Sequence, residues 1–157
     1  MSNENRYRLG AGIMLINSDR LVWVGRRIDN KDEAWQMPQG GIDKGEDPRA
    51  AAMRELEEET GIAPALVRQV EDAPVLELAY DLPETLRGHL WGGKYVGQRQ
   101  HWFLKRFHGS DADVDIATEH PEFSHWKWVE PRLLPELIVP FKRDMYRAIV
   151  DGFARWL

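Results

Sequence analysis

Three acidic residues, Glu55, Glu58 and Glu59, stand three and four positions apart, which places them together if the segment is helical. At roughly 100° per residue, an α-helix brings all three carboxylates within one arc about 100° wide. Like charges at this spacing repel one another, so the arrangement favours a bound cation. Hard carboxylate oxygens with no Cys or His beside them suit Mg²⁺ or Mn²⁺.

The residues on either side predict where this helix begins and ends. Asp47 is a good N-cap, Pro48 is a good first helical residue, and Gly61 favours a C-terminal stop. The sequence therefore predicts a helix from about Pro48 to Thr60. Two alanines, residues 51–52, share the acidic arc, and their small side chains are expected to leave space above the helix.

An acidic helix face exposed to solvent is the usual alternative for such a charge run. The wider sequence argues against it. Residues 40–62 read GGIDKGEDPRAAAMRELEEETGI and match the pattern G-x5-E-x7-R-E-U-x-E-E-x-G-U, with U apolar, at every fixed position. This segment resembles the Nudix box, and the chain is similar to the Nudix hydrolase family.

Length and composition are typical of one folded domain that spans residues 1–157. Hydrophobic residues make up 43% and charged residues 30% of the chain, as in ordinary globular proteins. The absence of Cys excludes disulfides and thiolate catalysis, and it favours a reducing, cytoplasmic location. We expect neither a signal peptide nor a membrane span, and the net charge of −5 argues against broad, non-specific nucleic-acid binding.

Hydrophobic patterns around the acidic helix predict a mixed α/β or α+β sandwich. Strands are expected at residues 8–17, 21–24, 99–107 and 123–129, with one or two more at 67–79, broken near Pro74. Residues 35–42 are expected to lead through Pro38 and two glycines into the acidic helix. Residues 81–98 have turn residues and little periodicity, which predicts a long loop of the kind that often has a function. Apolar residues that recur every four positions predict a C-terminal helix with one buried stripe. They are Phe141, Met145, Ile149 and Phe153.

Several phrases outside the box resemble the bacterial RNA 5′-pyrophosphohydrolases, a group that overlaps the diadenosine polyphosphate hydrolases. They are YR at residues 7–8, WQMPQGGI at 35–42, GQRQHWF at 97–103, PEF at 121–123, WKW at 126–128 and FKRD at 141–144. The similarity covers roughly residues 7–153. It implies the Nudix fold, an α/β/α sandwich with a mixed sheet in which the box forms a loop–helix–loop.

The resemblance assigns metal binding and catalysis to four acidic residues. Glu55, Glu58 and Glu59 match the metal-binding glutamates of the box. Glu122 matches a glutamate that a separate loop contributes, although Glu119 lies close enough in sequence to take its role. Mg²⁺ is the implied cofactor, with Mn²⁺ or another divalent metal as a substitute, and the implied reaction is hydrolysis by a metal-activated water.

Three further residues of the box are expected to support this site. Arg54 lies one helical turn before Glu58 and can hold its carboxylate. Gly40 is expected to form a turn, and Gly61 to end the helix.

The same resemblance selects residues that bind the substrate. Arg8 matches a residue that contacts the phosphates in RNA-acting members. Arg27, Gln39 and Lys142 are expected to bind the substrate as well. Ordinary surface charge is the alternative for the cations. Phe141 could stack on a base or pack in the core.

A calcium-binding loop is another interpretation of the acidic residues near Glu122. The residues that would occupy its positions 1, 3, 5 and 12 are Asp111, Asp113, Asp115 and Glu122. Its sixth position is Ile116 rather than glycine, which argues against this interpretation.

These residues leave three functional hypotheses. The first is removal of pyrophosphate from the 5′-triphosphate end of RNA, which the resemblance connects to the start of mRNA decay. The second is hydrolysis of diadenosine tetraphosphate or pentaphosphate. The third is a Nudix-fold nucleotide-binding module without activity, which the complete set of box glutamates disfavours. The sequence indicates no stable protein partner and no particular oligomeric state.

Overall fold

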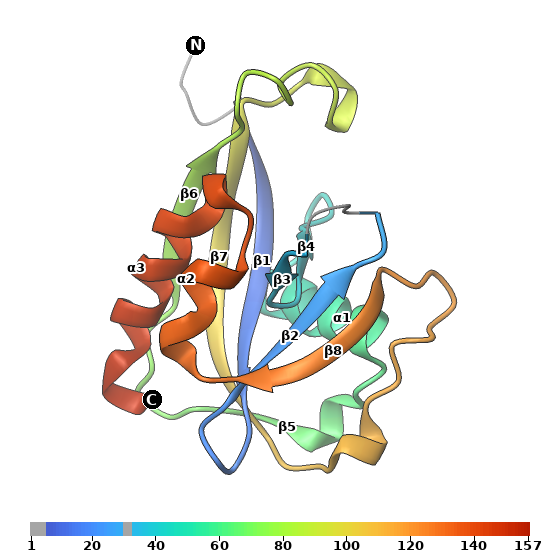
Figure 1. The fold of residues 1–157 in the computed structure, drawn as a ribbon, viewed down its shortest axis with the longest axis vertical. Coiled ribbons are helices and arrows are strands. Elements are labelled where there is room, and N and C mark those ends of the chain that lie inside the picture. Colours follow the sequence, from blue (N-terminus) through green and yellow to red (C-terminus); the bar gives the residue numbers. More distant parts are fainter. Residues whose placement is uncertain (1–5, 30–32) are drawn as a thin grey trace.

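The computed structural model describes residues 6–29 and 33–157, which form a mixed sheet with helices on both faces (Figure 1). The strands are β1 (Tyr7–Ile16), β2 (Val22–Arg27), β3 (Trp35–Gln36), β4 (Gln39–Gly41), β5 (Val67–Gln69), β6 (Leu76–Asp81), β7 (Gly97–Phe107) and β8 (Phe123–Val129). The α-helices are α1 (Pro48–Thr60), α2 (Leu134–Leu137) and α3 (Arg143–Phe153).

Strands β1 and β7 form the parallel centre of the sheet, paired from Tyr7 opposite Gly97 to Ile16 opposite Arg106. Strands β5 and β6 pair antiparallel with the other side of β7. The free side of β1 is divided, because β2 pairs at its end and β4 pairs near its start. Figure 1 shows β2 and its partner β8 running obliquely away from β1 at this division. The candidate site lies there.

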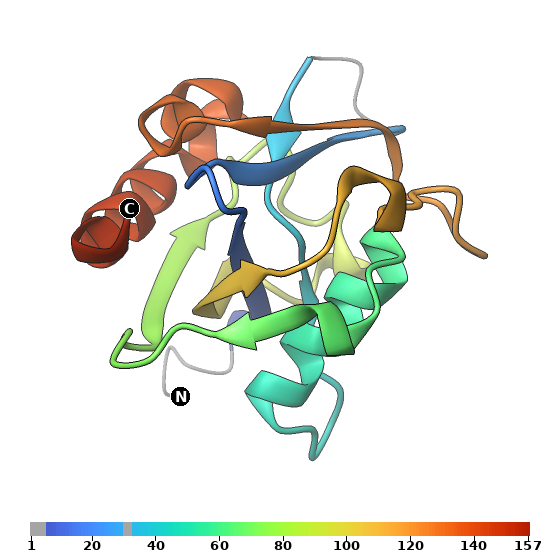
Figure 2. The same ribbon diagram turned by 90° about the horizontal axis from the view of Figure 1, so that it is seen from below.

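Alternating side chains of β1 supply two separate hydrophobic cores. Ile13 and Leu15 belong to the core that includes α1, whereas Met14 and Ile16 belong to the core that includes α3. Figure 2 shows α1 and the pair α2–α3 on opposite sides of the sheet. The predicted α/β/α sandwich with a mixed sheet is therefore confirmed.

Helix α1 has the predicted limits and the predicted caps. A side-chain oxygen of Asp47 accepts from two backbone N–H groups of the first turn, and Gly61 ends the helix with a left-handed φ of 71°. The expected space above Ala51 and Ala52 is absent, because both are buried in the core beside the sheet. The acidic arc of α1 consequently runs from solvent into the protein.

One further expectation holds, one needs correction, and one short helix was missed. Residues 82–96 form the predicted long loop, which projects from the top of the molecule in Figure 1. Helix α3 begins at Arg143 rather than Phe141, which lies in a preceding 3₁₀ turn, Pro140–Lys142. The short helix α2 had no sequence signal strong enough to predict it. In the described parts of the chain, none of the helices has the length and apolar character that crossing a membrane requires.

Candidate active site

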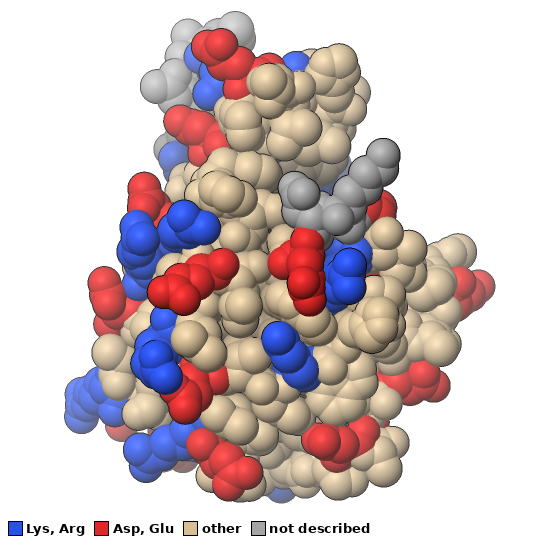
Figure 3. Space-filling model, in the orientation of Figure 1, with Lys and Arg blue, Asp and Glu red and all other residues tan. Residues whose placement is uncertain are grey.

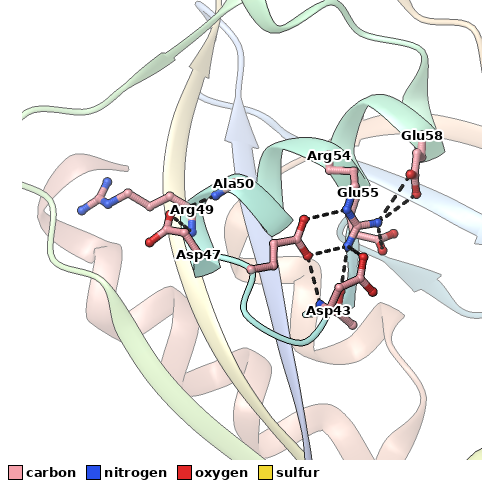
Figure 4. A network of polar contacts seen from close by, with 9 residues as sticks. Asp43, Asp47, Arg49, Ala50, Arg54, Glu55 and Glu58 are labelled. Carbon is pink, nitrogen blue, oxygen red and sulfur yellow. Dashed lines mark hydrogen bonds and ion pairs between the residues drawn. The ribbon is translucent and has the colours of Figure 1, made fainter.

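Arg54 is the centre of a polar network on α1 (Figure 4). Its Nε and Nη2 atoms each donate to one carboxylate oxygen of Glu46 at 2.9 Å, and Nη2 also donates to the Gly41 carbonyl at 3.0 Å. Nη1 donates to Glu55 at 2.9 Å and reaches Glu58 at 3.3 Å. These bonds from Arg54 lower the pKa of Glu46 to about 2. The predicted pairing with Glu58 is present, and the bidentate pair with Glu46 fixes the loop before α1.

Gly40 brings strand β4 against the carboxylate of Glu55. It lies opposite Ala11 in the sheet, and a Cβ atom at this position would collide with the Glu55 carboxyl group. The expectation that Gly40 forms a turn is therefore wrong, since close approach is what requires glycine here. A Cβ atom at Gly41 would likewise collide with the guanidinium of Arg8. The two glycines thus let an acid and a cation lie directly on the β4 backbone.

Glu59 is the most deeply buried acid of α1, with an exposed fraction of 1%. One carboxylate oxygen accepts from the Gln39 N–H at 3.0 Å, whereas the other has no hydrogen-bond partner among the described residues. Burial, followed by the adjacent Glu122 carboxyl group and the charge of Glu55, raises the pKa of Glu59 well above its usual value. A buried carboxylate with an unpaired oxygen and two acidic neighbours suits a divalent cation.

Glu122 reaches this cluster from the segment before β8. Pairing of β8 with β2 places Phe123 opposite Arg27, and the Glu122 carboxylate lies 3.9 Å from the Arg27 guanidinium. Burial raises the pKa of Glu55, and the charges of Glu58 and Glu122 add to this effect. The structure therefore brings together the four acids that the sequence selected.

These carboxylates suit Mg²⁺ or Mn²⁺ chemically, but their present positions do not form the ligand geometry of a metal site. Within residues 6–29 and 33–157, no group of three or more acidic, His or Cys side chains has positions that could hold a metal ion. Arg54 is part of the reason, because it binds carboxylate oxygens of both Glu55 and Glu58 that a metal ion would otherwise use. A cation that binds Glu58 would have to replace this long ion pair.

A pocket of about 500 Å³ opens beside the acid cluster. It connects to the acids through Gln39, whose N–H binds Glu59, and through Arg27, which lies near Glu122. Every residue predicted to bind substrate lines this pocket. These residues are Arg8, Arg27, Gln39, Phe141 and Lys142. Three cations therefore line a cavity that connects, through Gln39 and Arg27, to the carboxylates of Glu59 and Glu122.

Arg27 has a fixed orientation in the pocket wall. Its Nε and Nη2 atoms donate to the two carboxylate oxygens of Asp29, each at 2.8 Å. Asp29 was not predicted, because an acid two positions after an arginine is too common to be a signal. The remaining Nη1 group faces Glu122 at 3.9 Å.

Lys142 is a half-buried cation on two aromatic rings. Its Nζ atom lies 5.1 Å from the ring centroid of Tyr80 and 5.9 Å from that of Phe141. Burial, and then the charge of Arg27, lowers the pKa of Lys142 to about 8. Phe141 also contacts Tyr80, with ring centroids 5.8 Å apart, so it packs on the core and lines the pocket at once.

Several pocket residues were missed because they are apolar or neutral residues without a spacing pattern. They are Gln36, Tyr80, Leu82, Leu86, Leu90, Trp91, Gln98 and Val139. The unusual length of the predicted 81–98 loop was the signal that could have found five of them. The acids of the calcium-loop interpretation do not gather around one point. Asp111 accepts from the indole N–H of Trp128, and Asp113 accepts from the backbone N–H of Ser110.

Comparison with known proteins identifies the family. A model of the NUDIX domain matches residues 6–149. The chain therefore belongs to the Nudix family, as the sequence pattern predicted.

Curated relatives and solved structures agree with this assignment. A protein named RNA pyrophosphohydrolase from Erythrobacter litoralis (strain HTCC2594) is 61% identical over 150 residues, which cover 94% of this chain and 91% of that protein. One of the same name from Roseobacter denitrificans is 58% identical over 147 residues, with coverage of 94% and 91%. The fold is similar to a C. elegans Ap4A hydrolase binary complex, with a TM-score of 0.66, 21% identity and coverage of 92% and 98%. It is also similar to the E. coli dihydroneopterin triphosphate pyrophosphohydrolase, with a TM-score of 0.69, 19% identity and coverage of 93% and 98%.

Burial of Glu59 leads to a stability prediction for the metal-free protein. A carboxyl group whose pKa is raised by folding costs nothing below its unfolded pKa, and its cost grows as the pH rises toward the folded pKa. We therefore expect Glu59→Gln to stabilise the protein by about 1–3 kcal/mol at pH 8 and by much less near pH 4.5. Urea unfolding in EDTA at both pH values measures this difference. Exposed Glu57→Gln is the control, and a pH-independent difference would contradict the prediction.

Proposed function

We propose that this protein is a divalent-metal-dependent pyrophosphohydrolase that removes pyrophosphate from the 5′-triphosphate end of RNA. One observation carries the proposal: a pocket lined by three cations adjoins, through Gln39 and Arg27, the acid cluster that contains Glu59 and Glu122. Cations bind phosphate oxygens, and carboxylates bind the divalent metals that assist phosphoryl transfer. The relatives that share more than half of their residues with this chain carry the name of this activity.

The residues around the pocket would have two roles in the reaction: some would bind the phosphate chain, and others would accept a proton. Arg8, Arg27 and Lys142 would pair with oxygens of the phosphate chain and orient it toward α1. A divalent ion held by the glutamates would neutralise phosphate oxygens and lower the pKa of the attacking water. The adjacent pair Glu59 and Glu122 is suited to accept the water proton, because burial keeps the proton affinity of Glu59 high.

The surface agrees with recognition of an RNA end rather than of a long RNA. On the face shown in Figure 3, Lys and Arg side chains alternate with Asp and Glu instead of forming one cationic surface. The net charge of −5 has the same implication. We place the enzyme in the cytoplasm, where RNA is available and a chain without Cys needs no oxidising compartment.

Hydrolysis of dinucleoside polyphosphates is the second candidate function. The same cations and acids would serve it, and the fold resembles that of an Ap4A hydrolase. The rates of phosphate-product release from triphosphorylated RNA and from diadenosine tetraphosphate, measured side by side with Mg²⁺, separate the two. We expect the RNA to be the better substrate and EDTA to stop both reactions. Absence of turnover on both substrates in saturating Mg²⁺ would favour a binding module.

Glu122 and Glu119 offer a test of which acid of the 119–122 segment acts in the site. Both acids line one surface hollow, but only Glu122 adjoins Glu59, whereas Glu119 is exposed. We expect Glu122→Gln to depress kcat or Mg²⁺ affinity well beyond Glu119→Gln. Metal titrations of the initial rate for both variants measure this ranking. A reversed ranking would assign the role to Glu119.

A further inference from the structure

The Arg8 guanidinium contacts an aromatic ring on one side and the β4 backbone on the other. Its guanidinium carbon lies 5.1 Å from the ring centroid of Trp91, within the range of a cation–π contact. On its other side the guanidinium lies against Gly41, where a Cβ atom would collide with it. Among the described residues, Arg8 has no carboxylate partner within ion-pair distance, in contrast to Arg27 and Arg54. Its charge therefore stays available to a ligand in the pocket.

Trp91 has a backbone conformation that a large residue rarely adopts. Its φ is 51°, and the next two residues, Gly92 and Gly93, have φ values of 69° and 73°. Such a conformation persists only where surrounding contacts determine it, and it concentrates at functional sites. The Trp91 ring packs against the core that includes α3 and makes an edge contact with Tyr95, with centroids 6.2 Å apart. These contacts fix the ring over Arg8.

We propose that Trp91 is a positioning residue: it holds the Arg8 guanidinium between its ring and strand β4, so that Arg8 meets the phosphates of the bound substrate. This inference rests on the function proposed above. It gives the long 82–96 loop a role, since the loop delivers Trp91 to the pocket from a distant part of the chain. Direct stacking of a base on Trp91 is the competing role, and Arg8 already covers one face of the ring.

A double-mutant cycle separates positioning from direct contact with RNA. Trp91→Leu keeps an apolar side chain but removes the aromatic face, and Trp91→Phe keeps an aromatic ring. We expect Trp91→Leu to lower kcat/KM on triphosphorylated RNA about 5- to 30-fold, and Trp91→Phe to stay within about 3-fold of wild type. In the Arg8→Ala background, Trp91→Leu should change kcat/KM by less than about 2-fold.

Trp156→Leu is the matched control. Trp156 also lies under an arginine, with Arg155 5.5 Å from its ring centroid, but it is at the end of the chain and outside the pocket. This variant should leave kcat/KM unchanged, and melting temperatures of all variants show whether they are folded.

The possible outcomes are distinct. Equal losses from Trp91→Leu in the wild-type and Arg8→Ala backgrounds would overturn the inference, because Trp91 would then act on the RNA without Arg8. Unchanged kinetics in both backgrounds would overturn it as well. If the wild-type protein releases no pyrophosphate from RNA, the proposed function fails before any Trp91 variant is compared.

Discussion

Glu58→Gln should lower kcat by at least ~100-fold while the fold stays intact, a loss comparable to that of removing one key electrostatic contact from an active site. The amide keeps the size and the helix propensity of the glutamate but removes one negative ligand from the acid cluster. Little stability should be lost. The Glu58 side chain is 57% exposed, and its ion pair with Arg54 at i, i+4 is worth only about 0.3–0.5 kcal/mol.

Glu57→Gln is the control for this experiment, because Glu57 is exposed and is the direct neighbour of Glu58 on α1. Initial rates across a Mg²⁺ titration, together with melting temperatures, measure both variants. A Glu58→Gln enzyme that turned over near the wild-type rate in saturating Mg²⁺ would refute the carboxylate–metal mechanism.

Helix α1 shows how much of the site the sequence could predict. Asp47, Pro48 and Gly61 are local signals, so they predicted both ends of the helix and the common arc of its glutamates. The burial of each glutamate could not be predicted from the residues of the helix alone. Whether Glu58 remains in solvent while Glu59 is buried depends on where the sheet edge lies, and periodicity along one helix does not contain that position.

Local sequence signals, in contrast, did not predict which residues form the pocket. Arg8 and Lys142 come from the two ends of the chain, and only the resemblance to a family linked them before the fold was known. Tyr80 and Trp91 had no such signal, since aromatic residues in strands and loops usually pack in cores. Gly40 was wrongly predicted to form a turn. Glycine is favoured both in turns and where a side chain lies against the backbone, as Glu55 does here, so the residue type alone does not distinguish the two.

Arg8→Ala should lower kcat/KM on triphosphorylated RNA about 10- to 150-fold, which corresponds to the roughly 1.5–3 kcal/mol that a charge-assisted hydrogen bond contributes. Arg8 precedes the part of β1 that pairs with β4, so a short, paired backbone directs its side chain into the pocket. Arg8→Lys should recover only part of the activity, because an ammonium group cannot form the bidentate pair that a guanidinium forms with phosphate.

The melting temperature distinguishes a role in binding from a role in folding. Arg8 has no ion pair among the described residues, and its contact with Trp91 is worth only about 0.5–1 kcal/mol in a partly exposed position, so Arg8→Ala should shift the melting temperature by a few degrees at most. Exposed Arg6 lies two positions earlier, and Arg6→Ala should change neither quantity. A stable Arg8→Ala protein with unchanged RNA kinetics would make Arg8 an ordinary surface charge. It would also weaken the preference for RNA over dinucleotides, because Arg8 matches a residue that contacts the phosphates in RNA-acting members of the family.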